Sequence, residues 1–363
     1  MVKNKRFISA IVVASVCIAV SGAYAAGRIY TNKTIDDLKN YVDSSNKSIQ
    51  VVDSEQQVLE SRYNEVLKQY NESRKQTVLI QNQIDRLNFD RNQYQKKKEQ
   101  HQLVEKYQLQ VEYYNVCLFI KQLSLAQNEL EVVNKQISVE REKLNQGDST
   151  QLAVDELNSR KRIIQDKISG LNQNIEVGKN ALKSRLNETS GIQFDPSFTI
   201  PSVVEGTDTY SLSELQKKCK DNNIDLLQMN AYLGFYNTLI SNLKAIVGEN
   251  DSAYFSAISE RVKLQADANI MRTEIDNYVE HQYSIFKQSL SAYTTAQERK
   301  DILNRQLDLL KTKYENGDIS ELQYLSDRYL ILKELYDGYS AIIGKINEKT
   351  LMSLIEAGIV MGK

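Results

Sequence analysis

Proline limits how far a helix can run, and this chain of 363 residues contains only two, Pro196 and Pro201. A proline inside a helix removes a backbone hydrogen bond and clashes with the preceding turn. Because the two prolines lie close together, the long stretches on both sides are free to be helical. Gln, Asn, Lys, Glu, Leu and Ile dominate these stretches, a composition typical of helices with one narrow apolar stripe. We therefore predict an all-α fold.

Apolar residues recur at alternating steps of three and four positions, the spacing of coiled-coil helices. The clearest runs are Leu322, Leu325, Tyr329, Leu332, Tyr336, Tyr339, Ile343, Ile346 and Leu157, Ile164, Ile168, Leu171, Ile175, Leu182. A stripe this narrow is buried only against other helices. The pattern predicts long antiparallel coiled-coil hairpins.

The first 26 residues have the layout of an export signal. A basic start is followed by an apolar run from Phe7 to Val20, and Ala23-Tyr24-Ala25 has the small-x-small pattern of a signal-peptidase site. The segment is also nearly long enough to span a bilayer. We expect an exported protein of the cell envelope, in which residues 1–26 are either a cleaved signal peptide or a retained membrane anchor.

Residue types that carry catalysis or bind cofactors are scarce. His101 and His281, the only histidines, each lie alone in a polar helical context, and no Gly-rich phosphate-binding loop is present. Cys117 and Cys219 fall on apolar stripes, which predicts small buried side chains and no disulfide framework. The 46 Lys and Arg nearly balance the 47 Asp and Glu, and no basic stripe suits nucleic acid. We expect no enzymatic activity, cofactor, metal site or nucleic-acid partner.

The segments that interrupt the helical pattern form two similar sets, one in each half of the chain. The segment "KLNQGDSTQLAV" (143–154) matches "KYENGDISELQYL" (313–325) at an offset of 170 positions, and Asn46 matches Asn223 at an offset of 177. The chain is therefore predicted to contain two tandem copies. Their expected ranges are 34–191 and 211–358, joined by the Pro-containing linker 192–210.

Each copy is predicted to contain a first helix of roughly 38 residues, a long helix of roughly 65 to 72 and a return helix of roughly 40 to 43. Stacked end to end, the first and return helices could lie alongside the long helix. Each copy then forms two antiparallel columns with a sharp turn at Gly147 or Gly317. Four columns in one chain enclose little space, so oligomerisation is expected.

Three segments together resemble the outer-membrane efflux protein family, the TolC family. "KYENGDISELQYLSDRYLIL" (313–332) resembles the family's tip, and "RLNETSGIQFDPSFTIP" (185–201) is similar to its Pro-containing link between copies. "LSELQKKCKDNNIDL" (212–226) resembles the family's short helix, with Ile224 where Pro is usual. Their order, spacing and duplication extend the resemblance over nearly the whole chain after the N-terminal segment.

The resemblance implies a homotrimer that forms a hollow α-barrel, a conduit for efflux or secretion. It further implies docking by the helical tips to an adaptor (membrane fusion protein) of an ABC-type or related inner-membrane transporter, and a location at the outer membrane. The tip residues that this docking would use are Gly147, Asp148, Leu152, Gly317, Asp318 and Leu322.

Two departures from the family pattern matter. Segments 69–76 and 245–255, which stand where relatives carry membrane β-strands, are turn-sized. Membrane strands need about 9 to 11 residues each, so we predict that the family's β-barrel is absent. Without it, the protein would be anchored to the cytoplasmic membrane if residues 1–26 are retained.

The second departure is at the tip, where Gln323 and Ser326 occupy positions that are often acidic in the family. An acidic entrance would instead use Asp155, Glu156, Glu321 and Asp327. The alternative function is a membrane-anchored coiled-coil structural or adaptor protein of the envelope, without a channel. A closed trimer favours the conduit, whereas a monomer or dimer favours the alternative.

Overall fold

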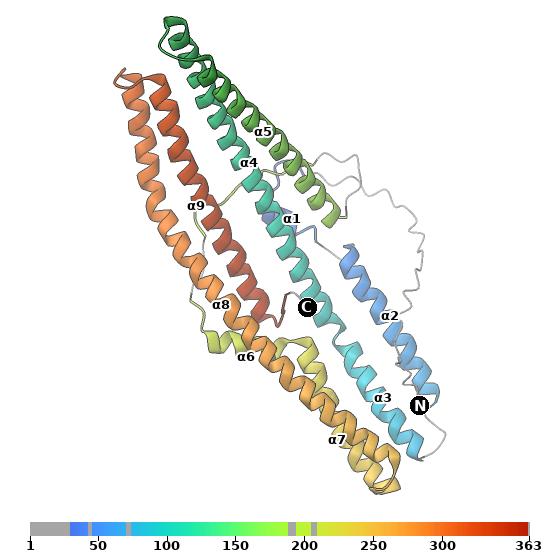
Figure 1. The fold of residues 1–363 in the computed structure, drawn as a ribbon. Coiled ribbons are helices and arrows are strands. Elements are labelled where there is room, and N and C mark those ends of the chain that lie inside the picture. The colour runs from blue at the N-terminus through green and yellow to red at the C-terminus, as the bar shows by residue number, and fades with distance from the viewer. Residues whose placement is uncertain (1–29, 43–45, 70–73, 188–193, 205–208, 362–363) are drawn as a thin grey trace, which may run out of the picture.

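The computed structural model describes residues 30–42, 46–69, 74–187, 194–204 and 209–361. The regular elements in these ranges are helices, and no residue in them belongs to a β-strand. The helices are α1 (Ile35–Lys39), α2 (Lys47–Lys68), α3 (Arg74–Asn92), α4 (Tyr94–Gln146), α5 (Gln151–Arg185), α6 (Leu212–Asn222), α7 (Ile224–Val247), α8 (Ser252–Glu315) and α9 (Glu321–Glu356). The predicted fold of long antiparallel helices is confirmed (Figure 1).

The helices form two long hairpins that reverse at the same end of the molecule (Figure 1). One hairpin is α4–α5 and the other is α8–α9, and α4 packs against α9 to join them. At the opposite end, α2 packs on α3, α3 on α7 and α7 on α8. The single helix α8, with 64 residues, runs through both halves. Stacked shorter helices therefore lie beside a long one, as the repeat predicts.

The prediction of one continuous first helix in each copy is wrong. In the second copy the helix is divided into α6 and α7 at Asn223, whose backbone is extended (φ −67°, ψ 119°). In the first copy it is divided into α1 and α2. The long helix of the first copy is also interrupted, at Gln93, although the Gln93 N–H still bonds to the Phe89 carbonyl at 3.2 Å.

The duplicated asparagines Asn46 and Asn223 perform the same two tasks. The Oδ1 atom of each caps the helix that follows, accepting from Ser48 N for α2 and from Leu226 N for α7, both at 2.9 Å. Each Nδ2 donates to a backbone carbonyl at the end of the return helix of its own copy, Arg185 O at 2.9 Å or Gly358 O at 3.0 Å. Each asparagine therefore marks a break between two helices and also hydrogen-bonds the end of the return helix of its copy. We call each of these contacts a joint.

The core consists of separate clusters along the helical seams. The largest lies where α1, the first copy's long and return helices and the linker meet, and includes Tyr30, Leu109 and Tyr113. A second, around Leu215, Ile275 and Met352, joins α6, α8 and α9. Within the described ranges, no helix combines the length and apolar character needed to cross a membrane. The predicted signal or anchor at 1–26 lies outside the described residues.

Candidate functional site

The first tip is the turn between α4 and α5. Gly147 adopts a left-handed conformation (φ 87°), and its N–H bonds to Leu144 O while Asp148 N bonds to Lys143 O at 2.8 Å. This pattern closes the C-terminus of α4, and a residue with a side chain reaches it only at a cost. Thr150 then starts α5, because its hydroxyl accepts from Ala153 N.

The second tip, between α8 and α9, repeats the same construction. Gly317 has φ 80°, its N–H bonds to Tyr314 O, and Asp318 N bonds to Lys313 O at 2.9 Å. Ser320 caps α9 by accepting from Gln323 N at 3.2 Å. The sequence prediction that Gly147-Asp148 and Gly317-Asp318 form equivalent turns is therefore matched by equivalent hydrogen bonds.

The side chains at the two tips differ. Leu152 is exposed, whereas its counterpart Leu322 is half-buried. At the second tip the rings of Tyr314 and Tyr324 stack with centroids 4.6 Å apart. The sequence analysis did not single out this pair, although two tyrosines flanking a Gly turn were a usable signal. The tips therefore share a backbone and present different surfaces.

The four residues assigned to an acidic entrance are not gathered at one place in the single chain. Glu321 forms an ion pair with Lys135 of α4, and Asp327 accepts from Gln323 Nε2 at 2.7 Å. Asp155 accepts from Gln151 Nε2 at 2.9 Å, and Glu156 is exposed on the other hairpin. An acidic ring at the entrance remains a prediction about an assembly.

Two ion pairs join the hairpins near their tips. Besides Lys135 with Glu321, Arg328 of α9 lies 3.5 Å from Glu131 of α4. Arg328 and α4 also line a polar cavity of about 360 Å³. The sequence analysis missed these partners, because the contact joins residues from different copies that share no local pattern.

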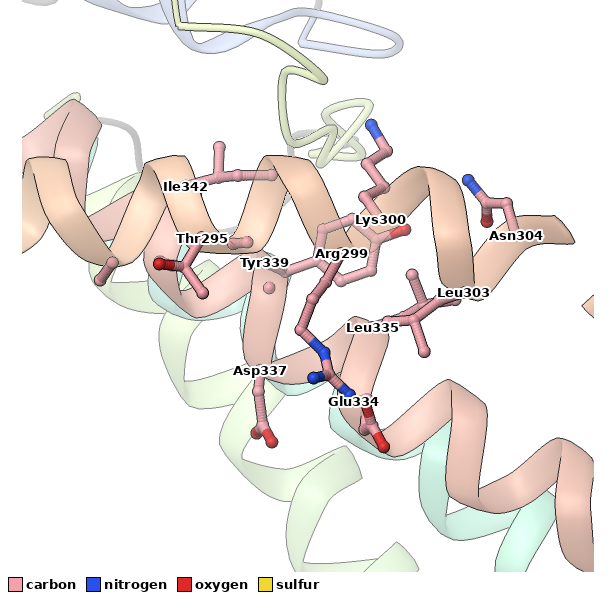
Figure 2. A pocket seen from close by; sticks show the side chains of 14 residues that line it. Thr295, Arg299, Lys300, Leu303, Asn304, Glu334, Leu335, Asp337, Tyr339 and Ile342 are labelled. Carbon is pink, nitrogen blue, oxygen red and sulfur yellow. Dashed lines mark hydrogen bonds and ion pairs between the residues drawn. The ribbon is translucent and has the colours of Figure 1, made fainter. Parts of the chain in front are cut away.

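A larger groove of about 510 Å³ lies between α8 and α9 (Figure 2). Small residues make its floor, with the position of a Cβ on Gly338 3.9 Å from Ala296 Cβ. Arg299 and Glu334 form an ion pair across it, and Lys300 and Tyr339 flank it (Figure 2). The groove follows from small residues on a coiled-coil seam and contains no arrangement of nucleophile and base.

Along the two hairpins, α5 packs on α4 and α8 packs on α9, so α5 and α8 are the two edges of the helical layer there. Toward the opposite end, α8 also packs on α6 and α7. Both edges expose pairs of apolar side chains at heptad spacing. Ile163 and Val177 on α5 are two heptads apart, and on α8 Phe255 and Val262 form one pair a heptad apart and Ile302 and Leu309 another. Exposed residues at heptad spacing are typical of a coiled-coil seam without its partner.

The internal repeat shows what these edges lack. The offset of 170 positions relates α8 to α4 and α9 to α5, so the contact of α4 with α9 inside the chain has an unfilled equivalent between α8 and another α5. Val132 of α4 is only 6% exposed, whereas its counterpart Ile302 on α8 is 48% exposed. The same apolar position is thus covered in one copy and uncovered in the other.

The remaining candidates from the sequence have ordinary structural settings. Cys117 and Cys219 are buried free thiols, and burial raises the pKa of each to about 12, so neither is a ready nucleophile. His101 is half-buried and His281 exposed. Among the residues that the structure describes, no group of three or more His, Cys, Asp or Glu could hold a metal ion.

Comparison with known structures identifies the fold. The chain superposes on the open-state MtrE outer membrane channel of Neisseria gonorrhoeae with a TM-score of 0.66 and 12% identity, covering 93% of this chain and 94% of that one. The CmeC outer membrane channel of Campylobacter jejuni gives 0.64 and 10%, covering 91% and 87%. CusC, described as forming a transmembrane channel, gives 0.62 and 13%, covering 92% and 95%.

The chain has the fold of the TolC-type outer-membrane channels. No family model matches its sequence. No curated protein matches it either. The family resemblance of its motifs is therefore supported by the arrangement of its helices, and at this low identity the likeness extends to the fold alone.

Proposed function

We propose that this chain assembles as a homotrimer whose helices close into a TolC-like conduit of an envelope efflux or secretion system. The observation that carries the proposal is the pair of uncovered edges on α5 and α8. Their counterparts inside the chain, α9 and α4, are already packed together. A neighbouring copy that places its α5 against α8 would repeat that contact and close the ring.

The internal contact also supplies the register of the closure. Inside the chain, Arg328 of α9 pairs with Glu131 of α4 at 3.5 Å. Subtracting 170 from 328 gives Asn158 on α5, and adding 170 to 131 gives Asp301 on α8. Asn158 of one copy should therefore face Asp301 of the next.

A cross-linking experiment tests this register. The full chain carrying Asn158→Cys and Asp301→Cys, treated with a short bismaleimide, should give covalent dimers and trimers and no larger species. The buried thiols of Cys117 and Cys219 are protected from the reagent, and Cys17 in the predicted signal segment is replaced by Ser in every variant. Each single variant should give no trimer, and Asn158→Cys paired with Ser259→Cys, far along α8, should give none.

Mass measurement of the uncross-linked protein provides the second readout. A trimer with a central hole in particle images supports the conduit. A stable monomer or dimer without a hole would overturn it in favour of an envelope coiled-coil protein without a channel.

The tips are proposed to dock an adaptor of the membrane fusion type, which connects the conduit to an ABC or related exporter. The support is the shared construction of the two turns, which would present six equivalent backbones at one end of a trimer. We place the assembly in the cell envelope, on the export signal predicted at 1–26 and on the outer-membrane location of the channels that share the fold.

A further inference from the structure

The half of α8 that lies away from the tips has an uncovered apolar surface of its own. Phe255 and Val262 are 57% and 55% exposed. In the proposed trimer, α5 runs antiparallel along α8 with Asn158 facing Asp301. Helix α5 ends twenty-seven positions after Asn158, opposite residue 274 of α8. Phe255 and Val262 therefore lie beyond the reach of α5.

Helix α2 continues the edge of the layer where α5 ends. Asn46, which caps α2, donates from Nδ2 to Arg185 O at 2.9 Å, and α2 lies below α5 on the same side of the layer (Figure 1). It packs on α3 as α5 packs on α4. Helix α2 exposes Val51 and Val58, seven positions apart and 56% and 50% exposed. Both edges of this half therefore expose apolar residues at heptad spacing.

The internal repeat relates these two edges to a contact that is already formed. Helix α7 is the counterpart of α2 at an offset of 177 positions, and α8 is the counterpart of α3 at an offset of 170. Arg91 of α3 donates to Glu60 of α2. At these offsets the same contact recurs, because Arg261 of α8 donates to Asn237 of α7. Since α3 and α7 pack against each other inside the chain, the equivalent contact would join α8 with α2 of another protomer.

The internal contact also gives the register. The rings of Phe89 on α3 and Phe235 on α7 have centroids 6.4 Å apart, and both residues are half-buried. Adding 170 to 89 gives Ser259 on α8, and subtracting 177 from 235 gives Val58 on α2. Ser259 and Val58 are both exposed in the single chain. Val58 of one protomer should therefore face Ser259 of the next.

The side chains around Ser259 suit Val58. Phe255 lies four positions before Ser259 and Val262 three positions after it, so all three share one face of α8. A small serine between two apolar side chains leaves a hole of the kind that receives an apolar knob in a coiled coil. A valine in this hole removes apolar surface of both helices from water.

We infer that α2 of one protomer packs along the half of α8 remote from the tips in the next protomer, with Val58 seated between Phe255 and Val262. The inference rests on the proposed trimer and adds to it a second interface, which we call the α2 seam. The α2 seam closes the wall of the conduit over the half that α5 does not reach, as far as the turn that joins α7 to α8.

Cysteine cross-linking tests the α2 seam separately from the trimer. The full chain carrying Val58→Cys and Ser259→Cys, in the Cys17→Ser background and treated with a short bismaleimide, should give covalent dimers and trimers. Each single variant should give no trimer. The exchanged pairs, Val58→Cys with Asp301→Cys and Asn158→Cys with Ser259→Cys, should also give none, because positions 259 and 301 lie roughly 60 Å apart along α8.

The two matched cysteine pairs distinguish the possible failures. Trimers from Asn158→Cys with Asp301→Cys, but none from Val58→Cys with Ser259→Cys, would overturn the α2 seam and leave the proposed trimer intact. An absence of trimers from both pairs would overturn the trimer itself and the α2 seam with it.

Charge substitutions provide a second test that needs no reagent. Val58→Asp should weaken trimer formation in light scattering by roughly tenfold or more, because a carboxylate in the seam must lose its hydration. Gln57→Asp, exposed on another face of α2, should not weaken it. Adding Ser259→Lys to Val58→Asp should restore the trimer through the opposite charge. Equal weakening by Val58→Asp and Gln57→Asp, or no restoration by Ser259→Lys, would contradict the α2 seam.

Discussion

At the scale of single residues, Gly358 shows how closely the return helix is fastened to the joint at Asn223. Its φ is +84°, and a Cβ placed on it would lie 2.2 Å from the carbonyl carbon of Asn222. No side chain fits there without moving backbone. Gly344, inside helix α9, has ordinary φ and nothing within 4 Å of its Cβ position, whereas Gly358 lies just beyond the end of that helix.

We therefore predict opposite effects of two chemically identical substitutions. Gly358→Ala should destabilise the protein by more than about 1 kcal/mol, because the left-handed conformation alone costs about that much and the clash adds to it. Gly344→Ala should stabilise it by about 0.5–1 kcal/mol, because alanine favours the helix interior. Urea unfolding of both variants measures the two changes in stability. A stabilising effect of Gly358→Ala would contradict the close packing of Gly358 against the backbone of Asn222.

Glu348 of α9 is a second residue with an unusual setting. Its Oε2 is buried without a hydrogen-bond partner, near the hydroxyls of Tyr107 and Tyr278. Burial raises the pKa of the Glu348 carboxyl. The folded state therefore holds this proton more tightly than the unfolded state, and stability falls as pH rises from the ordinary glutamate pKa through the raised one.

Glu348→Gln should accordingly raise the melting temperature at about pH 7, and the gain should shrink toward about pH 4, where the native carboxyl is protonated in both states. Glu280→Gln, an exposed glutamate on α8, is the control and should show no such pH-dependent gain. A gain for Glu348→Gln that persists unchanged at about pH 4 would indicate a packing effect instead.

At the scale of elements, the two tip turns can be altered without disturbing the packing of the helices they connect. Gly147 and Gly317 have positive φ, and nothing lies within 4 Å of their Cβ positions. A substitution there strains the backbone of the turn and meets no neighbour. The hairpin seams are held instead by buried residues such as Ile137 and Ile164.

Gly147→Val with Gly317→Val should therefore leave the helix content measured by circular dichroism nearly unchanged and disturb both turns by about 1–2 kcal/mol each. If the tips dock an adaptor, copurification of that adaptor should be lost. Gly234→Val with Gly344→Val, at open helical positions with ordinary φ, is the control. Undiminished copurification in the tip variant would show that docking occurs elsewhere.

At the scale of the whole molecule, the uncovered edge of α8 decides whether the chain functions alone. Ile302 is exposed in one protomer and would be buried by α5 of a neighbour. Ile302→Lys should leave the melting of the protomer unchanged and prevent the trimer, since a lysine at a buried seam must lose its hydration. Asn304→Lys, on another face of α8, should leave the trimer intact.

Light scattering of the two variants measures the assembly. Trimers of equal stability in both variants would contradict an interface at Ile302. Loss of the trimer in both variants would indicate a general effect of added charge. It would contradict a specific interface at Ile302.

Local patterns in the sequence determined the helices and the tips. Two prolines leave long helical stretches, and the duplicated Gly-Asp turns close through hydrogen bonds to residues only three to five positions away, as at Asp148 and Lys143. Such contacts depend on neighbouring residues alone, so the sequence was sufficient to predict them.

The tertiary structure decided what depends on residues far apart in the chain. The joint of Asn223 with Gly358, the ion pair of Lys135 with Glu321 and the split of the first helix were not predictable, because each needs a partner from another element. The uncovered edges on α5 and α8 also emerged only there. A periodic stripe specifies that a residue will be buried, whereas only packing determines which helix covers it and which surface is left for a partner.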